Sequence, residues 1–472
     1  MKHHTHISLS IILLAVALSS CSLDETLYSE LGDNYLSEDA AKEKVLTSAY
    51  GYANLRSNDY FYTSGMVSGE TWTQYGVIQN YFAYLVNFTW PTSHGYFESV
   101  WRTFYRAIRD ANIVIANTTA SSSPTDQALE AEARFIRGYS YAFLHDWFGG
   151  LPLYQSPNDD LYLAKASSDE TVAFIEADLL AAAKVLPLKQ STYGRATKGA
   201  AIGILSRVYL NDRQWQKAAE TAKQVIDLGV YDLYPDYTKL FLIENEGNSE
   251  MIWVNQANPS AGIAFLANIL PTNFPHQSNQ TLFASEVRFY DVFVNSFHPD
   301  DARRSLIITS YKSTTNGQEL QLLGNNGCLP GKYELDPNCV GSSYGNDIPV
   351  LRYADILLSR AEALNEINGP TAESVQLLNQ VRTRAHLAPY SIQDFASKEA
   401  FRNAIFQERE WEFFFEQRGR TDQIRHGTFI TRAKARGLTN AKDYQVLFPI
   451  PQAEIDANPN LIQNTGYAST EE

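Results

Sequence analysis

Residues 125–147, TDQALEAEARFIRGYSYAFLHDW, carry the most regular pattern in the chain, and FGGLP follows directly. Residues on one side of this stretch recur four and three positions apart, which is the period of a helix face: Leu129, Ala133, Ile136, Ser140, Phe143 and Trp147. Thr125 is a favourable N-cap, and Gly149-Gly150 before Pro152 predicts where the helix ends. Because aromatic residues also lie on its other faces, we expect this helix to be buried.

Further helix pairs lie downstream of this stretch. Residues 197–210 and 215–228 form one pair joined by a polar turn, and residues 352–368 and 371–386 form another, broken at Gly369-Pro370. Helix pairs of this length are the unit of tetratricopeptide stacks, although the strict repeat consensus is absent. The predicted fold class is therefore mostly α, a tetratricopeptide-like scaffold of helix pairs with long irregular loop insertions. We place the scaffold at residues 38–57, 98–254 and 350–430, the insertions at 58–97 and 255–347, and a C-terminal strap at 444–472.

The two insertions are the expected ligand-binding regions, since irregular loops on a rigid scaffold commonly carry function. Region 58–97 is rich in aromatic residues, on which the apolar face of a sugar ring can stack. The alternative is that these rings pin a long loop to the helices. Region 255–347 is rich in Asn, Gln, Ser, Gly and Pro. The candidate ligand contacts are Trp72, Tyr75, Tyr81, Tyr84 and Trp90 in the first region, and Asn273, Phe274 and His276 in the second.

The N-terminus is typical of a bacterial lipoprotein. Residues 7–18 form an apolar run that is too short to span a bilayer as a helix, and Leu18-Ser19-Ser20-Cys21 follows it as a lipobox would. We predict that residues 1–20 are a signal peptide, that Cys21 carries the lipid, and that residues 21–472 form a single domain. Asp24 and Glu25, just behind Cys21, favour export to the cell surface.

Charge and cysteine usage narrow the class of partner. The net charge is −15 and no basic cluster stands out, which argues against nucleic acid as a partner.

Cys328 and Cys339 close a short loop containing Gly and Pro, and in an oxidising envelope they are a possible disulfide.

Enzymatic motifs are not visible. The histidines show no metal-ligand spacing, and neither a nucleophile elbow nor a phosphate loop occurs. Glu408, Glu412 and Glu416 lie four residues apart and so share one helix face, where they could bind metal or act as acid and base. Nearby arginines can neutralise them, so we predict a structural ion-pair network, no metal site and no cofactor. The arginines in question are Arg352, Arg382, Arg409 and Arg418.

Several blocks resemble the signatures of the SusD/RagB family, in that family's order and over nearly all of residues 21–472. The C-terminal stretch at 448–467, FPIPQAEIDANPNLIQNTGY, is similar to the terminal signature of the family. The others are AEARFIRGY at 131–139 with WFGGLPL at 147–153, LRYADILL at 351–358 with AEALNE at 361–366, NQVR at 379–382 and EREWEF at 408–413. The stretch 417–422 departs from the family pattern.

This resemblance implies a non-catalytic surface lipoprotein of the outer membrane that captures a glycan and passes it to a SusC-like TonB-dependent transporter. Some relatives accept peptides, as the family's RagB-type members do, so a peptide ligand is the first alternative. From the residues alone, an all-α glycoside hydrolase and a helical scaffold for other envelope proteins also stay open.

Overall fold

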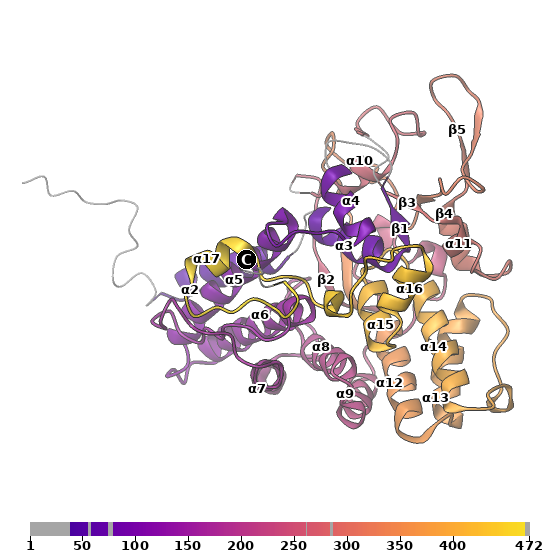
Figure 1. Ribbon diagram of the computed structural model, residues 1–472. Helices are drawn as coiled ribbons and strands as arrows, with labels where there is room; N and C mark the ends of the chain where they lie inside the picture. The colour runs from indigo at the N-terminus through magenta and orange to yellow at the C-terminus, as the bar shows by residue number, and fades with distance from the viewer. Residues whose placement is uncertain (1–37, 55–57, 74–78, 261, 284–286, 468–472) are drawn as a thin grey trace, which may run out of the picture.

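The computed structural model describes residues 38–54, 58–73, 79–260, 262–283 and 287–467, and the fold is mostly helical as predicted. The scaffold helices pack in chain order, each against the next, and form an arc across the molecule (Figure 1). Such stacking of successive helices is the architecture of tetratricopeptide-like repeats. The scaffold helices are α2 (Asp39–Ala53), α5 (Gly95–Ala116), α6 (Pro124–Phe148), α7 (Ser168–Val185), α8 (Lys198–Asn211), α9 (Trp215–Asp227), α12 (Tyr353–Asn368), α13 (Ala372–Arg384) and α14 (Lys398–Glu412).

The predicted helix ends are nearly all confirmed. Thr197 and Thr371 cap α8 and α13 by accepting hydrogen bonds from the backbone N–H groups of Ala200 and Ser374. The predicted N-cap of α6 is wrong by two residues: Pro124 is the first helical residue, because proline has its φ already set for that position, and Ser123 precedes it. Gly149, with φ +75°, ends α6 as predicted.

The prediction that residues 58–97 form a loop is wrong. The region contains α3 (Asn58–Ser68), β1 (Thr71–Trp72), α4 (Gln79–Asn87) and the start of α5. In α4, Phe82 and Leu85 are buried three residues apart along one face, and Phe88, directly after the helix, is buried too. That face packs on the core, and such short helices owe their stability to tertiary packing rather than to their own propensity.

Residues 255–347 are irregular as predicted and contain only short elements. Those are α10 (Phe265–Ile269), α11 (Asp291–Val294), β3 (Arg288–Phe289), β4 (Ile307–Ile308), β5 (Ser310–Lys312), β6 (Glu319–Gln321) and β7 (Leu329–Pro330). In the described residues the strands form antiparallel pairs: β1 with β3, β4 with β7, β5 with β6, and β2 (Met251–Asn255) with β8 (Ile348–Arg352). Of these strands, β1, β3, β4 and β5 lie in the upper right part of Figure 1 with α11, and α3 and α4 lie beside them, above the helical arc.

The C-terminal segment binds across the scaffold, as a strap would, but it is not extended throughout. A short helix, α17 (Gln452–Ala457), begins directly after Pro451 and ends before Pro459. The backbone N–H of Phe448 donates to the carbonyl of Trp147 over 2.8 Å, and the Asn464 side chain donates to the carbonyls of Phe148 and Phe448. The segment therefore covers the glycine turn at the end of α6 and hydrogen-bonds to the last carbonyls of that helix. Two more short helices, α15 (Gly419–Arg425) and α16 (Phe429–Ala435), precede it.

The disulfide considered for Cys328 and Cys339 is not formed; both are buried free thiols. The backbone of Cys328 forms an antiparallel β-bridge with Phe289 of β3, whereas the thiol of Cys339 faces the backbone carbonyls of Asn279 and Gly341. The loop between the two cysteines therefore places them in separate environments. Burial raises the pKa of the Cys328 thiol to about 11.

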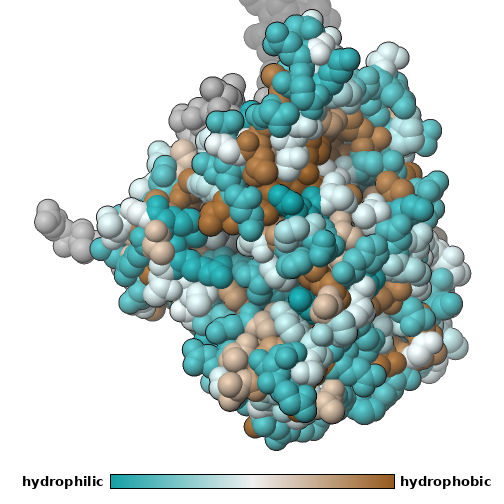
Figure 2. Space-filling model, turned by 90° about the vertical axis from the view of Figure 1, so that its right-hand side faces the viewer, coloured by the Kyte–Doolittle hydropathy of each residue, from teal (hydrophilic) through white to brown (hydrophobic). Residues whose placement is uncertain are grey.

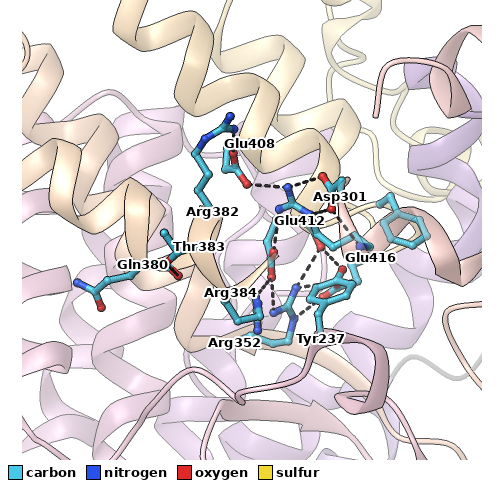
Figure 3. A network of polar contacts seen from close by, with 12 residues as sticks. Tyr237, Asp301, Arg352, Gln380, Arg382, Thr383, Arg384, Glu408, Glu412 and Glu416 are labelled. Atoms are coloured by element: carbon cyan, nitrogen blue, oxygen red, sulfur yellow. Dashed lines mark hydrogen bonds and ion pairs between the residues drawn. The ribbon is translucent and has the colours of Figure 1, made fainter. Parts of the chain in front are cut away.

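A buried ion-pair network forms at the predicted glutamate face (Figure 3). At its centre, the Glu412 carboxylate, at the end of α14, lies 2.9 Å from Arg352, 2.6 Å from Arg384 and 3.1 Å from Arg303. All four side chains are at most 4% exposed. Burial opposes ionisation of Glu412, but the three guanidinium groups outweigh it and lower its pKa to about 2.

Four more carboxylates and two more cations complete the network. Glu250 pairs with Arg352 and Arg384, Glu416 with Arg352 and Lys332, Glu408 with Arg303 and Arg382, and Asp301 with Arg303. Five carboxylates thus face five cations, which balances the buried charge. The prediction of a structural network is confirmed for Arg352 and Arg382.

The partners predicted for Arg409 and Arg418 are wrong. Arg409 pairs with Asp355 and Asp422, and Arg418 donates to the carbonyl of Val350. The reason is helix geometry: Arg409 is one residue from Glu408, so its side chain points about 100° away from the glutamate face.

Glu70 is a buried acid outside this network, between α3 and β1. Its carboxylate accepts a hydrogen bond from the backbone N–H of Phe415 over 2.7 Å. Burial, only partly offset by this hydrogen bond, raises the pKa of Glu70 to about 7.

We expect Glu412→Gln to lower the free energy of unfolding by ~3–5 kcal/mol, because three buried guanidinium groups lose their shared counter-charge. Urea unfolding followed by circular dichroism measures this. The control is Asp227→Asn, which breaks the exposed Lys223–Asp227 pair and should change the free energy of unfolding by less than ~0.5 kcal/mol. Similar losses in both variants would show that the network contributes no more than a surface pair.

We expect Glu70→Gln to change how stability depends on pH. Between pH 4.5 and 7 the folded parent binds more protons at Glu70 than the unfolded chain does, so this group's contribution to stability falls as pH rises. Glutamine keeps the acceptor oxygen and removes the titration. The free energy of unfolding of the variant, relative to that of the parent, should therefore rise by ~3 kcal/mol from pH 4.5 to pH 7. Unfolding curves at several pH values measure the gain, with exposed Glu220→Gln as the control. A gain that does not vary with pH would contradict a raised pKa.

Candidate functional site

The two insertions meet at the β1–β3 strand pair. Thr71 is paired with Phe289 and Trp72 with Arg288, so residues more than 200 positions apart lie side by side. The peptide N–H of Tyr290 donates to the carbonyl of Glu70 over 3.3 Å and extends this contact. The pairing brings an aromatic residue from each insertion to one place.

Trp72 and Tyr290 form the aromatic pair of this site. Their ring centroids are 6.2 Å apart and their planes are inclined by 32°. Both residues are half-buried, and burial raises the pKa of the Tyr290 hydroxyl. Two tilted, partly exposed rings form a surface on which the C–H face of a sugar can stack. We call this surface, made by Trp72 and Tyr290, the aromatic platform.

Hydrogen bonds fix the edge of the aromatic platform. The indole N–H of Trp72 donates to the carbonyl of Asn326 over 2.8 Å. Asn326, with φ +49°, exchanges two hydrogen bonds with Asp291: its N–H donates to the carboxylate over 2.9 Å and its side-chain oxygen accepts from the Asp291 N–H over 2.8 Å. The indole therefore has one orientation before any ligand arrives, which reduces the entropy lost on binding.

The other candidates from residues 58–97 separate into different environments. Tyr84, on α4, is 42% exposed, and its ring lies edge-on to His94 with centroids 6.1 Å apart. Trp90 is only 5% exposed; it packs against Phe88 and Phe448 and donates to the Tyr467 hydroxyl. Trp90 is thus a core residue that anchors the C-terminal segment, and its predicted role as a ligand contact is wrong. Tyr75 and the side chain of Tyr81 lie outside the described residues.

In the second insertion, Asn273 has a structural role. Its side chain accepts from the Tyr311 hydroxyl over 2.8 Å and donates to Ser313 over 3.1 Å, which holds the β5–β6 hairpin. Phe274 packs on the Tyr311 ring with centroids 5.2 Å apart. His276 is exposed, and its ring nitrogen lies 2.6 Å from the carbonyl of Phe274. These residues support the hairpin and do not contact the aromatic platform through any recorded interaction between described residues.

Tyr290 was not among the predicted contacts. The sequence does carry a signal for it: Val287, Phe289 and Tyr290 are strand-forming residues in an otherwise irregular region. Figure 2 shows that hydrophobic residues gather in the upper half of the molecular face that carries α11, below a polar projection. Phe283 and Val292, which flank this segment of the chain, are 53% and 73% exposed. Exposed apolar surface of this kind marks a binding region more often than a structural one.

The described residues contain no group of three or more His, Cys, Asp or Glu that could hold a metal ion. Across the same residues, no helix is both long and apolar enough to cross a membrane.

Comparison with known families matches both halves of the chain. Residues 309–467 match a family model described as the SusD family, and residues 23–210 match one described as "Starch-binding associating with outer membrane". The chain is 26% identical over 435 residues to a SusD-like protein of Formosa agariphila, covering 78% of this chain and 80% of that protein. It is 24% identical over 455 residues to the starch-binding protein SusD of Bacteroides thetaiotaomicron, covering 81% of each.

Solved structures share the fold. A laminarin-binding SusD-like protein superposes with a TM-score of 0.79 at 21% identity, covering 91% of this chain and 99% of that one. Surface glycan-binding protein A from Bacteroides fluxus gives a TM-score of 0.77 at 23% identity, covering 91% of this chain and 100% of that one. The solved structures show the fold, and the family models match residues 23–210 and 309–467, so the chain is similar to proteins of the SusD family in its fold and at both ends of its sequence.

Proposed function

We propose that this protein is a non-catalytic glycan-binding lipoprotein of the outer membrane, which captures oligosaccharide or polysaccharide and delivers it to a SusC-like TonB-dependent transporter. The observation that carries the proposal is the aromatic platform, in which the β1–β3 pair brings a half-exposed Trp72 and Tyr290 together where the two insertions meet. Relatives of this chain are named for binding starch, laminarin and surface glycans, which supports the same class of ligand.

Capture would occur by stacking and hydrogen bonding. A pyranose ring lays its apolar face on the indole, while its hydroxyl groups remain available to polar groups at the edge of the site. The orientation of Trp72 is already fixed by Asn326, so the platform needs no rearrangement to accept a sugar.

The acids near the aromatic platform support a binding role over a hydrolytic one. A glycoside hydrolase needs two carboxylates flanking the bond to be cleaved, about 5–9.5 Å apart. Asp291 accepts from the backbone of Asn326, and Glu70 is buried and accepts from the backbone of Phe415. Both carboxylates therefore already serve the local structure.

The outer-membrane location rests on the N-terminus and on the family description. The matched model is described as associating with the outer membrane. Cys21 follows a signal-peptide-like run, and its acyl chains would supply the anchor. The transporter partner is inferred from the family resemblance.

We expect residues 22–472 to bind at least one polysaccharide from a panel of plant, algal and host glycans, measured by isothermal titration calorimetry. Trp72→Ala and Tyr290→Ala should each weaken that binding about tenfold, since loss of a stacked ring costs ~1.5 kcal/mol. Tyr193→Ala removes an exposed ring (44%) outside the insertions and should leave binding unchanged.

The same preparations decide between the classes of function. Binding to a peptide mixture but to no glycan would overturn the ligand class. Release of shorter sugars from a bound polysaccharide, abolished by replacing one acid, would overturn the non-catalytic role.

We also expect Cys21→Ser to move the full-length protein from the outer-membrane fraction to the soluble fraction, because no described helix could hold it in the membrane without the lipid. Cell fractionation with immunoblotting measures the shift, and Ser22→Ala serves as the control. Retention of the Cys21→Ser variant in the membrane would refute lipid anchoring at this residue.

A further inference from the structure

A second cleft lies far from the aromatic platform. It has a volume of about 440 Å³ and is formed by α5, the loop after α6 and the C-terminal segment around α17. In Figure 1, α5 and α17 lie on the left of the molecule, whereas β1 and β3 lie at the upper right. A volume of this size is within the range of small-molecule sites, roughly 300–1,000 Å³.

The walls of this cleft are held in place by hydrogen bonds between the three segments. On the α5 side, the Tyr105 hydroxyl donates to the carbonyl of Pro152 over 3.0 Å, and the Asn112 side chain donates to the carbonyl of Tyr154 over 3.0 Å. On the opposite side, the Asn458 side chain donates to the carbonyl of Leu163 over 2.9 Å. The cleft is therefore formed before any ligand binds, and little ordering would be lost on association.

The floor of the cleft is aromatic. Trp101 is buried beneath Tyr105, with ring centroids 4.9 Å apart, and Tyr154 meets Tyr105 edge-on at 5.8 Å. At the rim, Tyr162 is 50% exposed. These rings offer flat apolar surface to a ring-shaped ligand, as aromatic side chains do in sugar-binding sites.

The rim on the α5 side is basic. Arg102, Arg106 and Arg109 line the cleft and are four and three residues apart, so they share one face of the helix. With Asp159 and Glu454 as the acidic lining residues, the lining carries a net charge of +1 (three Arg against two acids), although the whole chain is at −15. Because Glu98 and Asp110, just outside the lining, pair with two of these arginines, any attraction for an anion depends on the arginine that has no acid beside it.

One of these arginines has no carboxylate partner. Arg102 is paired with Glu98 and Glu454, and Arg109 with Asp110. Arg106 forms no ion pair or side-chain hydrogen bond within the part of the chain that the structure describes, and its guanidinium lies 5.8 Å from the centre of the Tyr52 ring. Tyr52 does not line the cleft, but Arg106 does, and a guanidinium without an acid partner can bind a carboxylate or sulfate in two hydrogen bonds.

We propose that this cleft is a second binding site, specific for a saccharide ring that bears one anionic group, with Arg106 as the residue that binds the anion. The site is separate from the aromatic platform and does not depend on it. It would allow the protein to hold acidic sugar units at one side of the molecule while the aromatic platform binds another part of a chain or another chain.

The test uses residues 22–472 and three small probes: a glucuronate-containing disaccharide, the neutral disaccharide cellobiose, and benzoate. We expect calorimetry to detect the glucuronate disaccharide, with affinity falling as NaCl is raised. Arg106→Gln should weaken this binding about tenfold or more, which is the loss expected for a charge-assisted hydrogen bond. Tyr162→Ala, at the exposed rim, should also weaken it, and Lys184→Gln, which removes one exposed positive charge elsewhere, should not.

Trp72→Ala separates this inference from the proposed function. Loss of glucuronate binding in Trp72→Ala but not in Arg106→Gln would place the anion at the aromatic platform and overturn the second site. If cellobiose bound as tightly as the glucuronate disaccharide, charge would have no role. If benzoate bound as tightly, the ligand ring would not have to be a sugar. If the glucuronate disaccharide did not bind, the second site would be overturned altogether. Loss of polysaccharide binding in Trp72→Ala with intact binding of the disaccharide would leave both sites standing.

Discussion

The ion-pair network around Glu412 joins the helical scaffold to the second insertion, and the position of the candidate site depends on it. Glu412 and Glu408 come from α14. Arg352 is the last residue of β8, just before α12, and Arg384 is the last residue of α13, whereas Asp301, Arg303 and Lys332 belong to the insertion. Since each of these charges would be costly to bury alone, the segments are held together as a set: displacing any one of them would leave a buried charge without its partner. Ordinary apolar packing tolerates sliding and repacking more readily than this. The base of the insertion is thus fixed, and this base supports β3 and Tyr290, the residue directly after β3.

Rigidity at the base also explains how an irregular segment of some ninety residues can present an ordered binding surface. Its strands are two to three residues long, too short to be stable alone. They are stabilised by pairing with segments already in place: β3 with β1, which follows directly on Glu70, and Glu70 in turn accepts from the backbone of Phe415, just beyond α14. The aromatic platform is therefore connected, through the β1–β3 pair and the Glu70–Phe415 hydrogen bond, to the end of α14 that carries Glu412. Its two rings come from distant parts of the chain but share one support.

The sequence predicted the parts of this arrangement that local physics determines. The long helices have a clear period, favourable caps and glycine stops, so α6, α8, α9, α12 and α13 could be placed to within one or two residues. Short elements could not be placed in this way, because α3, α4 and β1 form only where distant segments cover them. The two tryptophans illustrate the same limit. Trp72 and Trp90 both lie in the aromatic-rich first insertion, so the sequence does not distinguish them. Trp90 is buried because it contacts Tyr467, 377 positions later in the chain. Likewise, the glutamate face was visible from its spacing, but the choice of Arg303, Lys332 and Arg384 as partners was set by which loops fold onto α14.

The aromatic platform and the cleft beside α5 use the same kind of flat ring surface under different electrostatic conditions. At the aromatic platform the indole of Trp72 donates to Asn326, which exchanges hydrogen bonds with Asp291, and Arg288 is the cross-strand neighbour of Trp72. In the cleft, Arg106 adds a positive charge that no carboxylate among the described residues neutralises. The net charge of −15 repels an anion on average, and a guanidinium without an acid partner attracts one locally. Both places offer aromatic rings, so charge would decide whether a sugar binds at the aromatic platform or in the cleft beside α5. That follows from how the fold pairs its other ionic groups: Arg102 and Arg109, on the same helix face, are both paired with acids, and only Arg106 between them is not.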